Sequence, residues 1–208
     1  MARHFLLVSR GGMHDRPSAK GALRRELLAR RDGLAPEFRA NASRLVAGRI
    51  LAGFGVAPAI LGAYLPIRSE VDPRSLMTVL AERGARVCAP AIKGDHLEFR
   101  EWTPAAVLEP QGLGTRAPGP AAPVLRPEIL LVPLAGFDRR GHRLGYGRGF
   151  YDRAIARLRA DGAPLLAIGL AFSAQEVPAV PDDPFDIALD AIVTEAEWVR
   201  PRETPPPS

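Results

Sequence analysis

Two apolar runs separated by a helical segment constrain the possible folds most strongly. Residues 59–65 and 86–91 are short, nearly continuous apolar runs, which is typical of buried strands. Between them, Asp72 and Pro73 supply a helix cap and a first-turn proline, and Gly84 ends the helical segment. A strand, a helix and a second strand in this order predict parallel pairing, and therefore an α/β sheet.

The same patterns predict further helices and strands. The predicted helices are 18–31, 35–54 and 151–159, and the predicted strands include 128–132, 165–171 and a short one within 186–194. Residues 96–102 alternate weakly, which favours an edge strand. Residues 103–127 are rich in proline, glycine and alanine and predict a long connection with little regular structure. We therefore expect an α/β fold with three layers, α/β/α, around a mostly parallel sheet.

The length of the chain suits one domain. Its 208 residues, 47% of them hydrophobic, are enough for one core. We expect a single α/β domain at 18–200, between a disordered N-terminal extension at 1–17 and a disordered proline-rich tail at 201–208. No apolar run approaches the ~20 residues of a membrane-spanning helix, and the first apolar stretch is too short for a secretory signal. Cys88 is the single cysteine, which suits a reducing compartment, so we expect a cytoplasmic protein.

The charge balance is mildly basic. The chain has 28 basic and 23 acidic residues, giving a net charge of +5. Such a charge could serve nucleic acid, lipid or small polyanions, but no RNA-binding signature with interleaved aromatic residues is present. We favour a solvated basic surface and expect neither nucleic-acid nor membrane partners. The four histidines show no metal-ligand spacing.

A segment rich in glycine and arginine, residues 137–153, predicts an anion-binding loop. Gly145, Gly147 and Gly149 alternate with other residues, so that backbone N–H groups can turn towards a ligand. The spacing matches neither a Walker loop nor a dinucleotide fingerprint. Nearby arginines suit phosphate oxygens, and Asp152 could hold the Mg²⁺ that accompanies a nucleotide. A plain glycine-rich surface loop remains the alternative from composition alone.

Three charged residues outside this segment are further candidates. Lys20 and Arg24 are four residues apart on the predicted first helix and so share one face. Glu70 follows the strand at 59–65, on the side of an α/β sheet where ligands bind. Taken alone, the two cations could simply face solvent and Glu70 could be a second capping carboxylate. They matter for function only if they meet the glycine segment.

Four separated segments, taken in order, resemble the 5-formyltetrahydrofolate cyclo-ligase family, also called 5,10-methenyltetrahydrofolate synthetase. The resemblance spans residues 18–198. The segments are Lys20-x-x-x-Arg24, Tyr64-Leu-Pro-x-x-x-Glu70-Val-Asp72, the motif from Val132 to Arg153, and Asp186-x-x-x-Asp190-x-x-Val-Thr194. The resemblance implies a three-layer α/β enzyme, usually monomeric, that uses ATP and Mg²⁺. Its reaction converts 5-formyltetrahydrofolate to 5,10-methenyltetrahydrofolate and releases ADP and phosphate through a phosphorylated formyl intermediate.

The resemblance also implies a role for each matched residue. The implied ATP-binding residues are Lys20, Arg24, Arg143, Leu144, Gly145, Tyr146, Gly147, Arg148, Gly149, Phe150 and Tyr151. The implied folate-binding residues are Leu65, Glu70, Tyr146, Gly147, Arg148, Gly149 and Phe150. Arg143 and Arg148 are the implied catalytic residues, and Asp152 and Asp186 the implied Mg²⁺ ligands. Because the reacting nucleophiles belong to the substrate, the absence of a Ser/His/Asp or Cys/His constellation is expected.

Two departures from the family pattern concern the folate side. Relatives often carry Gly-Ile-x-Glu-Pro before the strand that leads to the glycine segment, and this chain has Gly114-Thr-Arg-Ala-Pro118 instead. Phe150 stands where tyrosine is commoner, which keeps an aromatic wall and loses a hydroxyl. A kinase or ligase that uses ATP on another acceptor is therefore the alternative function, and a basic nucleic-acid-associated protein with a vestigial nucleotide site is a more distant one.

Overall fold

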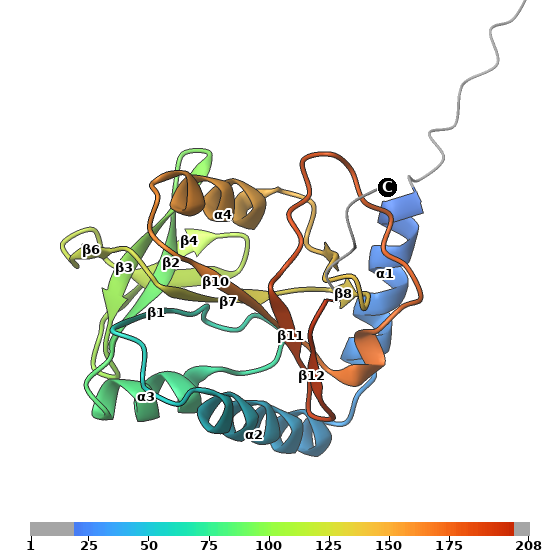
Figure 1. Cartoon of the computed structure of the whole chain (residues 1–208), viewed down its shortest axis with the longest axis horizontal. Coiled ribbons are helices and arrows are strands. Elements are labelled where there is room, and N and C mark those ends of the chain that lie inside the picture. The colour runs from blue at the N-terminus through green and yellow to red at the C-terminus, as the bar shows by residue number, and fades with distance from the viewer. Residues whose placement is uncertain (1–18, 202–208) are drawn as a thin grey trace, which may run out of the picture.

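The computed structural model describes residues 19–201 and is organised around one large sheet (Figure 1). The helices are α1 (Ala19–Asp32), α2 (Pro36–Gly53), α3 (Arg74–Glu82) and α4 (Phe150–Ala160), with a 3-10 helix at Ser173–Gln175. The eight strands of the large sheet are, in spatial order, β12 (Trp198–Val199), β11 (Ala191–Val193), β10 (Leu166–Leu170), β7 (Ile129–Pro133), β1 (Ile60–Gly62), β2 (Arg86–Lys93), β3 (His96–Trp102) and β6 (Val124–Leu125).

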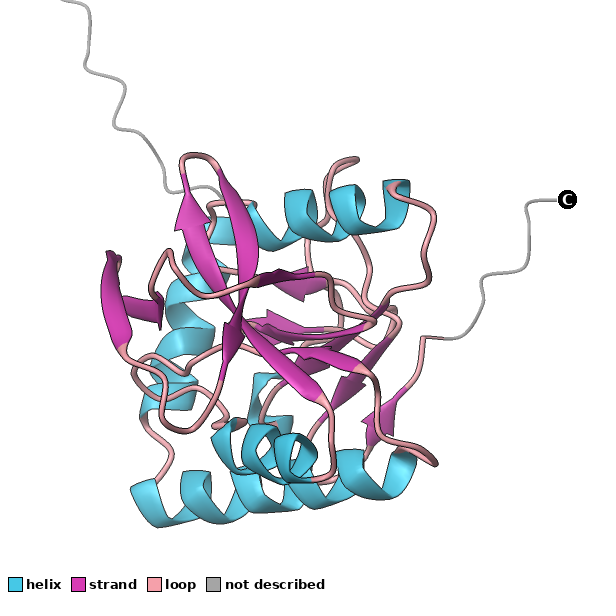
Figure 2. Ribbon diagram, turned by 90° about the vertical axis from the view of Figure 1, so that its left-hand side faces the viewer, coloured by secondary structure: helices cyan, strands magenta, loops and turns pink. Residues whose placement is uncertain are grey.

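The five central strands, β11 to β2, run parallel, and β12, β3 and β6 add antiparallel pairs at the two sides. The chain leaves β1 through α3 towards β2, and it leaves β7 through α4 in the opposite direction, towards β10. Right-handed crossovers in opposite directions put their helices on opposite faces of the sheet. Figures 1 and 2 show α2 and α3 on one face and α4 on the other, so the predicted three-layer fold is confirmed.

Two apolar cores hold the layers together. One packs α2 and α3 against the sheet, and its centre includes Ile50, Leu76 and Leu80, each at most 1% exposed. The other packs α4 against the opposite face through Ile155 and Leu158. Cys88 lies in this second core, and burial raises the pKa of its thiol to about 12, which disfavours the reactive thiolate.

Helix α1 lies at the side of the sheet, against β8 (Gly136–Phe137) and the 3-10 helix. Gly136 makes this contact possible, because a Cβ there would collide with Leu27 of α1. Strand β8 pairs with β9 (Arg143–Leu144), a hairpin that the sequence patterns did not predict. As a result, the first helix is fixed beside the glycine segment.

Two predictions for the middle of the chain are wrong. Residues 103–127 contain a β-hairpin, β4 (Leu108–Gly112) with β5 (Thr115–Pro118), and then β6. Because β6 pairs with β3, the strand at 96–102 is not at the edge of the sheet. The prolines and glycines that suggested an irregular connection are compatible with short strands at a sheet margin and with the hairpin turn, where Leu113 has a φ of 55°.

Most predicted boundaries differ from the observed ones by a residue or two; the strand predicted at 59–65 is shorter, because β1 ends at Gly62. Helix α3 begins at Arg74 rather than at Pro73, and the Asp72 carboxylate accepts the Arg74 N–H at 3.0 Å. Ser18, the first residue of the predicted helix 18–31, lies outside the described residues, as do the extension at 1–17 and residues 202–208 of the tail. Within residues 19–201, no helix is both long and apolar enough to cross a bilayer.

Candidate active site

One cavity of about 830 Å³ opens at the carboxyl ends of β1 and β7, where the strand order reverses direction. This is the place where ligands of open α/β sheets bind. Every residue implied by the family resemblance lines the cavity, including both metal candidates. The further lining residues are Tyr64, Ile67, Arg68, Pro90, Ile92, Leu97, Leu113, Thr115, Arg116, Pro133 and Asp183.

The glycine segment forms a tight loop that ends in the first turn of α4. Gly147 and Gly149 have φ values of 89° and 64°, in the left-handed region that favours glycine. No side chain caps the start of α4. The helix therefore presents its first-turn N–H groups and the positive end of its dipole to the cavity, which suits phosphate.

Arg24 of α1 and Arg148 of the loop supply cationic groups on this side of the cavity. The Arg24 Nε donates to the Gly145 carbonyl at 2.6 Å, and its guanidinium lies where a Cβ on Gly147 would approach Nη2 to 3.3 Å. Arg148 is exposed and, within residues 19–201, makes no hydrogen bond or ion pair. Its guanidinium is thus available to a ligand.

Arg143 and Asp152 form a largely buried ion pair in the wall of the cavity. Arg143 Nη2 lies 2.6 Å from Asp152 Oδ1, and the Arg143 side chain is only 5% exposed. The second Arg143 nitrogen, Nη1, donates to the Ile187 carbonyl at 2.6 Å. Burial lowers the pKa of Arg143, and the Asp152 carboxylate opposes that shift. Asp152 therefore both lines the cavity and neutralises the buried charge of Arg143.

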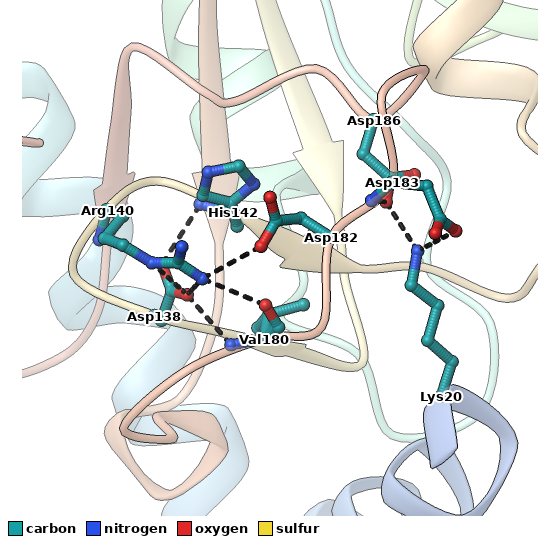
Figure 3. A network of polar contacts seen from close by, with 8 residues as sticks. All are labelled: Lys20, Asp138, Arg140, His142, Val180, Asp182, Asp183 and Asp186. Atoms are coloured by element: carbon teal, nitrogen blue, oxygen red, sulfur yellow. Dashed lines mark hydrogen bonds and ion pairs between the residues drawn. The ribbon is translucent and has the colours of Figure 1, made fainter. Parts of the chain in front are cut away.

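Lys20 lies between two carboxylates of the loop before β11. Its Nζ is 2.5 Å from Asp183 Oδ2 and 2.6 Å from Asp186 Oδ2 (Figure 3). Burial alone would lower the pKa of Lys20, but the two carboxylates raise it. Burial alone would likewise raise the pKa of Asp186, but Lys20 and the Asp183 N–H lower it. These ion pairs hold the ammonium group at the same side of the cavity as Arg24.

A second network holds that loop in place. Asp138 is fully buried and accepts the Val180 N–H at 2.9 Å and the Arg140 guanidinium at 2.8 Å. Arg140 reaches on to Asp182 at 3.2 Å, as Figure 3 shows. The loop that carries Asp183 is thus tied to the start of the glycine motif. Sequence reasoning missed both Asp138 and Asp183, although Asp138 lies inside the quoted motif.

The opposite side of the cavity carries a buried carboxylate. Glu70 is 8% exposed; its Oε2 accepts the Ile67 N–H at 2.8 Å and its Oε1 accepts the Tyr146 hydroxyl at 2.8 Å. Burial raises the pKa of Glu70, against the effect of these two hydrogen bonds. Leu65 and Phe150 add apolar walls. This side suits a flat, partly apolar group with N–H donors.

The altered segment Gly114–Pro118 forms part of the β4–β5 hairpin. Thr115 and Arg116 line the cavity, whereas Ala117 is fully buried in the protein. Arg116 donates to the Leu108 carbonyl at 2.7 Å and stays exposed. The hairpin therefore reaches the cavity despite its departure from the family pattern, and it brings a cation there.

The carboxylates fit Mg²⁺ only together with a phosphate ligand. No cluster of three or more His, Cys, Asp or Glu side chains suited to a metal occurs within residues 19–201. Asp152 and Asp186 each keep one oxygen without a hydrogen bond in that part of the chain, Oδ2 and Oδ1 respectively. Mg²⁺ is commonly held by one or two carboxylates plus substrate phosphates, so this donor set is compatible with nucleotide-bound metal.

Comparison with known proteins agrees with this geometry. The profile described as the 5-formyltetrahydrofolate cyclo-ligase family matches residues 16–195. The chain belongs to this family. A cyclo-ligase from Mycolicibacterium smegmatis is 29% identical over 188 residues, covering 86% of this chain and 94% of the relative. The cyclo-ligase from Escherichia coli K12 is 30% identical over 180 residues, covering 81% and 98%.

A solved structure of another cyclo-ligase family member extends the likeness to three dimensions. The NMR structure of 5,10-methenyltetrahydrofolate synthetase from Aquifex aeolicus has a TM-score of 0.75 at 29% identity, covering 91% of this chain and 96% of that one. The family reaction is the ATP-dependent cyclisation of 5-formyltetrahydrofolate to 5,10-methenyltetrahydrofolate. The chain is thus a cyclo-ligase, and the cavity is its candidate active site.

Proposed function

We propose that the 830 Å³ cavity binds ATP with Mg²⁺ beside the glycine loop and 5-formyltetrahydrofolate beside Glu70, so that the formyl oxygen meets the γ-phosphate between them. The observation that supports this most is the joining of a cationic end and a carboxylate end in one continuous cavity. Such an arrangement suits a reaction in which one substrate phosphorylates the other, because positioning and charge neutralisation dominate phosphoryl transfer.

The cationic end supplies the phosphate contacts. Arg24, Arg143 and Arg148 line it together with the first turn of α4. Lys20 joins them when it exchanges its carboxylate partners for phosphate oxygens. Asp152 and Asp186 would hold Mg²⁺ through their remaining oxygens, and the metal would neutralise phosphate charge there.

The chemistry then needs no protein nucleophile. The formyl oxygen attacks the γ-phosphorus as the bond to ADP breaks, and the formyl carbon becomes electrophilic. N10 of the folate attacks that carbon and loses its proton, and phosphate leaves with the former formyl oxygen. Arg143 and Arg148 stabilise the negative charge on the transferred group. Glu70 accepts hydrogen bonds from N–H groups of the pterin.

A near-UV absorbance assay tests the proposal. The purified protein is mixed with 5-formyltetrahydrofolate, ATP and MgCl₂, and the methenyl product is followed with ADP release measured in parallel. We expect equal amounts of the two products and no absorbance change when either ATP or Mg²⁺ is omitted. ADP release without the methenyl band would contradict the proposal and favour the alternative, a different acceptor for the phosphoryl group.

The neighbouring residues Arg24 and Arg25 provide a matched test of the phosphate end. Arg24 lines the cavity, whereas Arg25 is exposed and does not. We expect Arg24→Ala to raise the KM for ATP about tenfold, since a charge-assisted hydrogen bond contributes roughly 1.5–3 kcal/mol. Arg25→Ala should leave it within about twofold. Equal effects of the two substitutions would contradict the assignment of Arg24.

The remaining expectations concern the setting of the enzyme. We propose that it acts as a monomer in the cytoplasm, because each cavity is formed within one chain and the lone thiol is buried. Light scattering at assay concentrations should give the mass of one 22.4 kDa chain.

A further inference from the structure

Arg31 is an arginine buried in the last turn of α1, outside the cavity lining. Its side chain is fully buried, which is rare for arginine. The Nε donates to Ser69 Oγ at 3.0 Å, and Nη2 donates to the Tyr146 hydroxyl at 3.1 Å. Its nearest carboxylate, that of Asp32, is 3.9 Å away, and Nη1 has no hydrogen-bond partner. Packing alone does not account for a charge in this position.

Arg31 favours one direction for the hydrogen bond between Tyr146 and Glu70. A guanidinium can only donate, so the Tyr146 oxygen must accept from Arg31. The Tyr146 proton is then directed to Glu70 Oε1, at 2.8 Å. With Ile67 N–H donating to Oε2, both oxygens of Glu70 accept hydrogen bonds, which favours the ionised carboxylate. Arg31 thus donates to Tyr146 and Tyr146 donates to Glu70, so both hydrogen bonds run towards the Glu70 carboxylate.

We propose that Arg31 is a positioning residue for the folate end of the cavity. Acting through the Tyr146 hydroxyl, it holds Glu70 as an ionised acceptor in a fixed orientation and so selects ligands that present N–H donors to that carboxylate. The inference rests on the proposed placement of the folate at Glu70. Arg31 itself does not touch the substrate.

Among the charged groups around Glu70, Arg31 is the cation that most favours the ionised form of this carboxylate. The groups that face the carboxylate are Arg31 from α1, Tyr64 and Arg68 from the segment after β1, Tyr146 from the glycine loop and Tyr151 from α4. Burial raises the pKa of Glu70, and Arg31 and Arg68 oppose that shift. Arg68 is exposed to solvent, which weakens its effect, whereas Arg31 is not.

The substitution Arg31→Met tests the proposal through the pH dependence of folate binding. Binding needs ionised Glu70, so affinity falls as the pH drops through the pKa of that carboxyl. Without Arg31 the pKa is higher, and the acid limb of kcat/KM for 5-formyltetrahydrofolate should move up by about one pH unit. Below both pKa values the KM for folate should be about tenfold higher than in the unaltered enzyme, and the difference should vanish as the pH rises above them. The KM for ATP should stay within twofold.

Tyr146→Phe provides a second variant that keeps Arg31 in place, in case Arg31→Met fails to fold. It breaks the bridge between Arg31 and Glu70 and should move the acid limb in the same direction. Arg30→Met is the matched control, because Arg30 is exposed and bonded to Glu26 at 2.8 Å. An unchanged acid limb in folded Tyr146→Phe, or in folded Arg31→Met, would overturn the proposal.

Glu70→Gln separates failure of this inference from failure of the proposed folate site. If Glu70→Gln leaves folate binding intact, the folate is not at Glu70 and the proposed site is wrong. If Glu70→Gln weakens binding and Arg31→Met leaves the acid limb in place, only the role of Arg31 is wrong. The proposal expects Glu70→Gln to weaken binding and to remove the pH effect of Arg31→Met in the double variant.

Discussion

Replacing Arg148 by alanine should lower kcat about 10²- to 10³-fold, because a preorganised donor that meets transition-state charge contributes on that scale. The fold should be unaffected, since the side chain is exposed and has no partner within residues 19–201. Steady-state absorbance assays give kcat. Thermal unfolding gives the midpoint temperature Tm, which should change by no more than about 2 °C.

Two further variants sharpen this test. Arg148→Lys keeps the charge and loses the forked donor geometry, so it should recover only part of the activity. Arg83→Ala removes another exposed arginine, at the C-terminal end of α3 and outside the cavity lining, and should keep kcat within about twofold. Near-normal kcat in Arg148→Ala would show that the transferred phosphoryl group lies elsewhere.

Asp152→Asn should have two separate effects, one on Mg²⁺ and one on stability. The loss of a carboxylate should raise the Mg²⁺ concentration needed for half-maximal rate about tenfold or more. The Arg143 guanidinium, only 5% exposed, would also lose its counter-charge. Removing one partner of a buried pair costs about 3–5 kcal/mol. Asparagine still offers an acceptor and Asp152 is 24% exposed, so we expect about 2 kcal/mol.

Asp186→Asn is the comparison that separates the two effects. Its ion pair with Lys20 is more exposed, at 34% and 23%, and such pairs contribute about 0–1 kcal/mol. We expect this variant to raise the Mg²⁺ requirement with little change in the free energy of unfolding. Urea unfolding and Mg²⁺ titrations of both variants measure this. Normal turnover of Asp152→Asn at low Mg²⁺ would remove that residue from the metal site.

The sequence predicts the frame of the fold well because the frame depends on local patterns. Continuous apolar runs identify β1, β2, β7 and β10, and their order with α3 and α4 predicts the parallel sheet and its layers. The β4–β5 hairpin escaped prediction, because its prolines and glycines are as common in irregular loops. Short pairs such as β8 with β9 depend on tertiary contacts, here the packing of Leu27 against Gly136.

The candidate site, like the fold, was predicted from the sequence only in part. The family motifs identified the lining residues, and the structure brings them to one cavity. What the sequence did not predict are the partners behind them. Arg31 is one of four arginines on α1; it lies four residues after Leu27 and so on the same face, but arginine is almost never fully buried, and its residue type therefore suggested exposure. Asp183 stands in a proline- and aspartate-rich loop, and its contact with Lys20 spans 163 positions in the chain.

The Lys20 ion pairs mean that the ammonium charge at the proposed phosphate site is already compensated by carboxylates of the protein. A nucleotide without its metal would have to draw Lys20 away and then face Asp183 and Asp186 with bare phosphates, leaving like charges opposed. With the metal present, Lys20 and Asp186 each exchange one opposite charge for another. In the proposed site, metal and nucleotide affinity would therefore be thermodynamically linked, and the linkage would be reciprocal. Such a site would discriminate between free ATP and its magnesium complex before any chemistry begins.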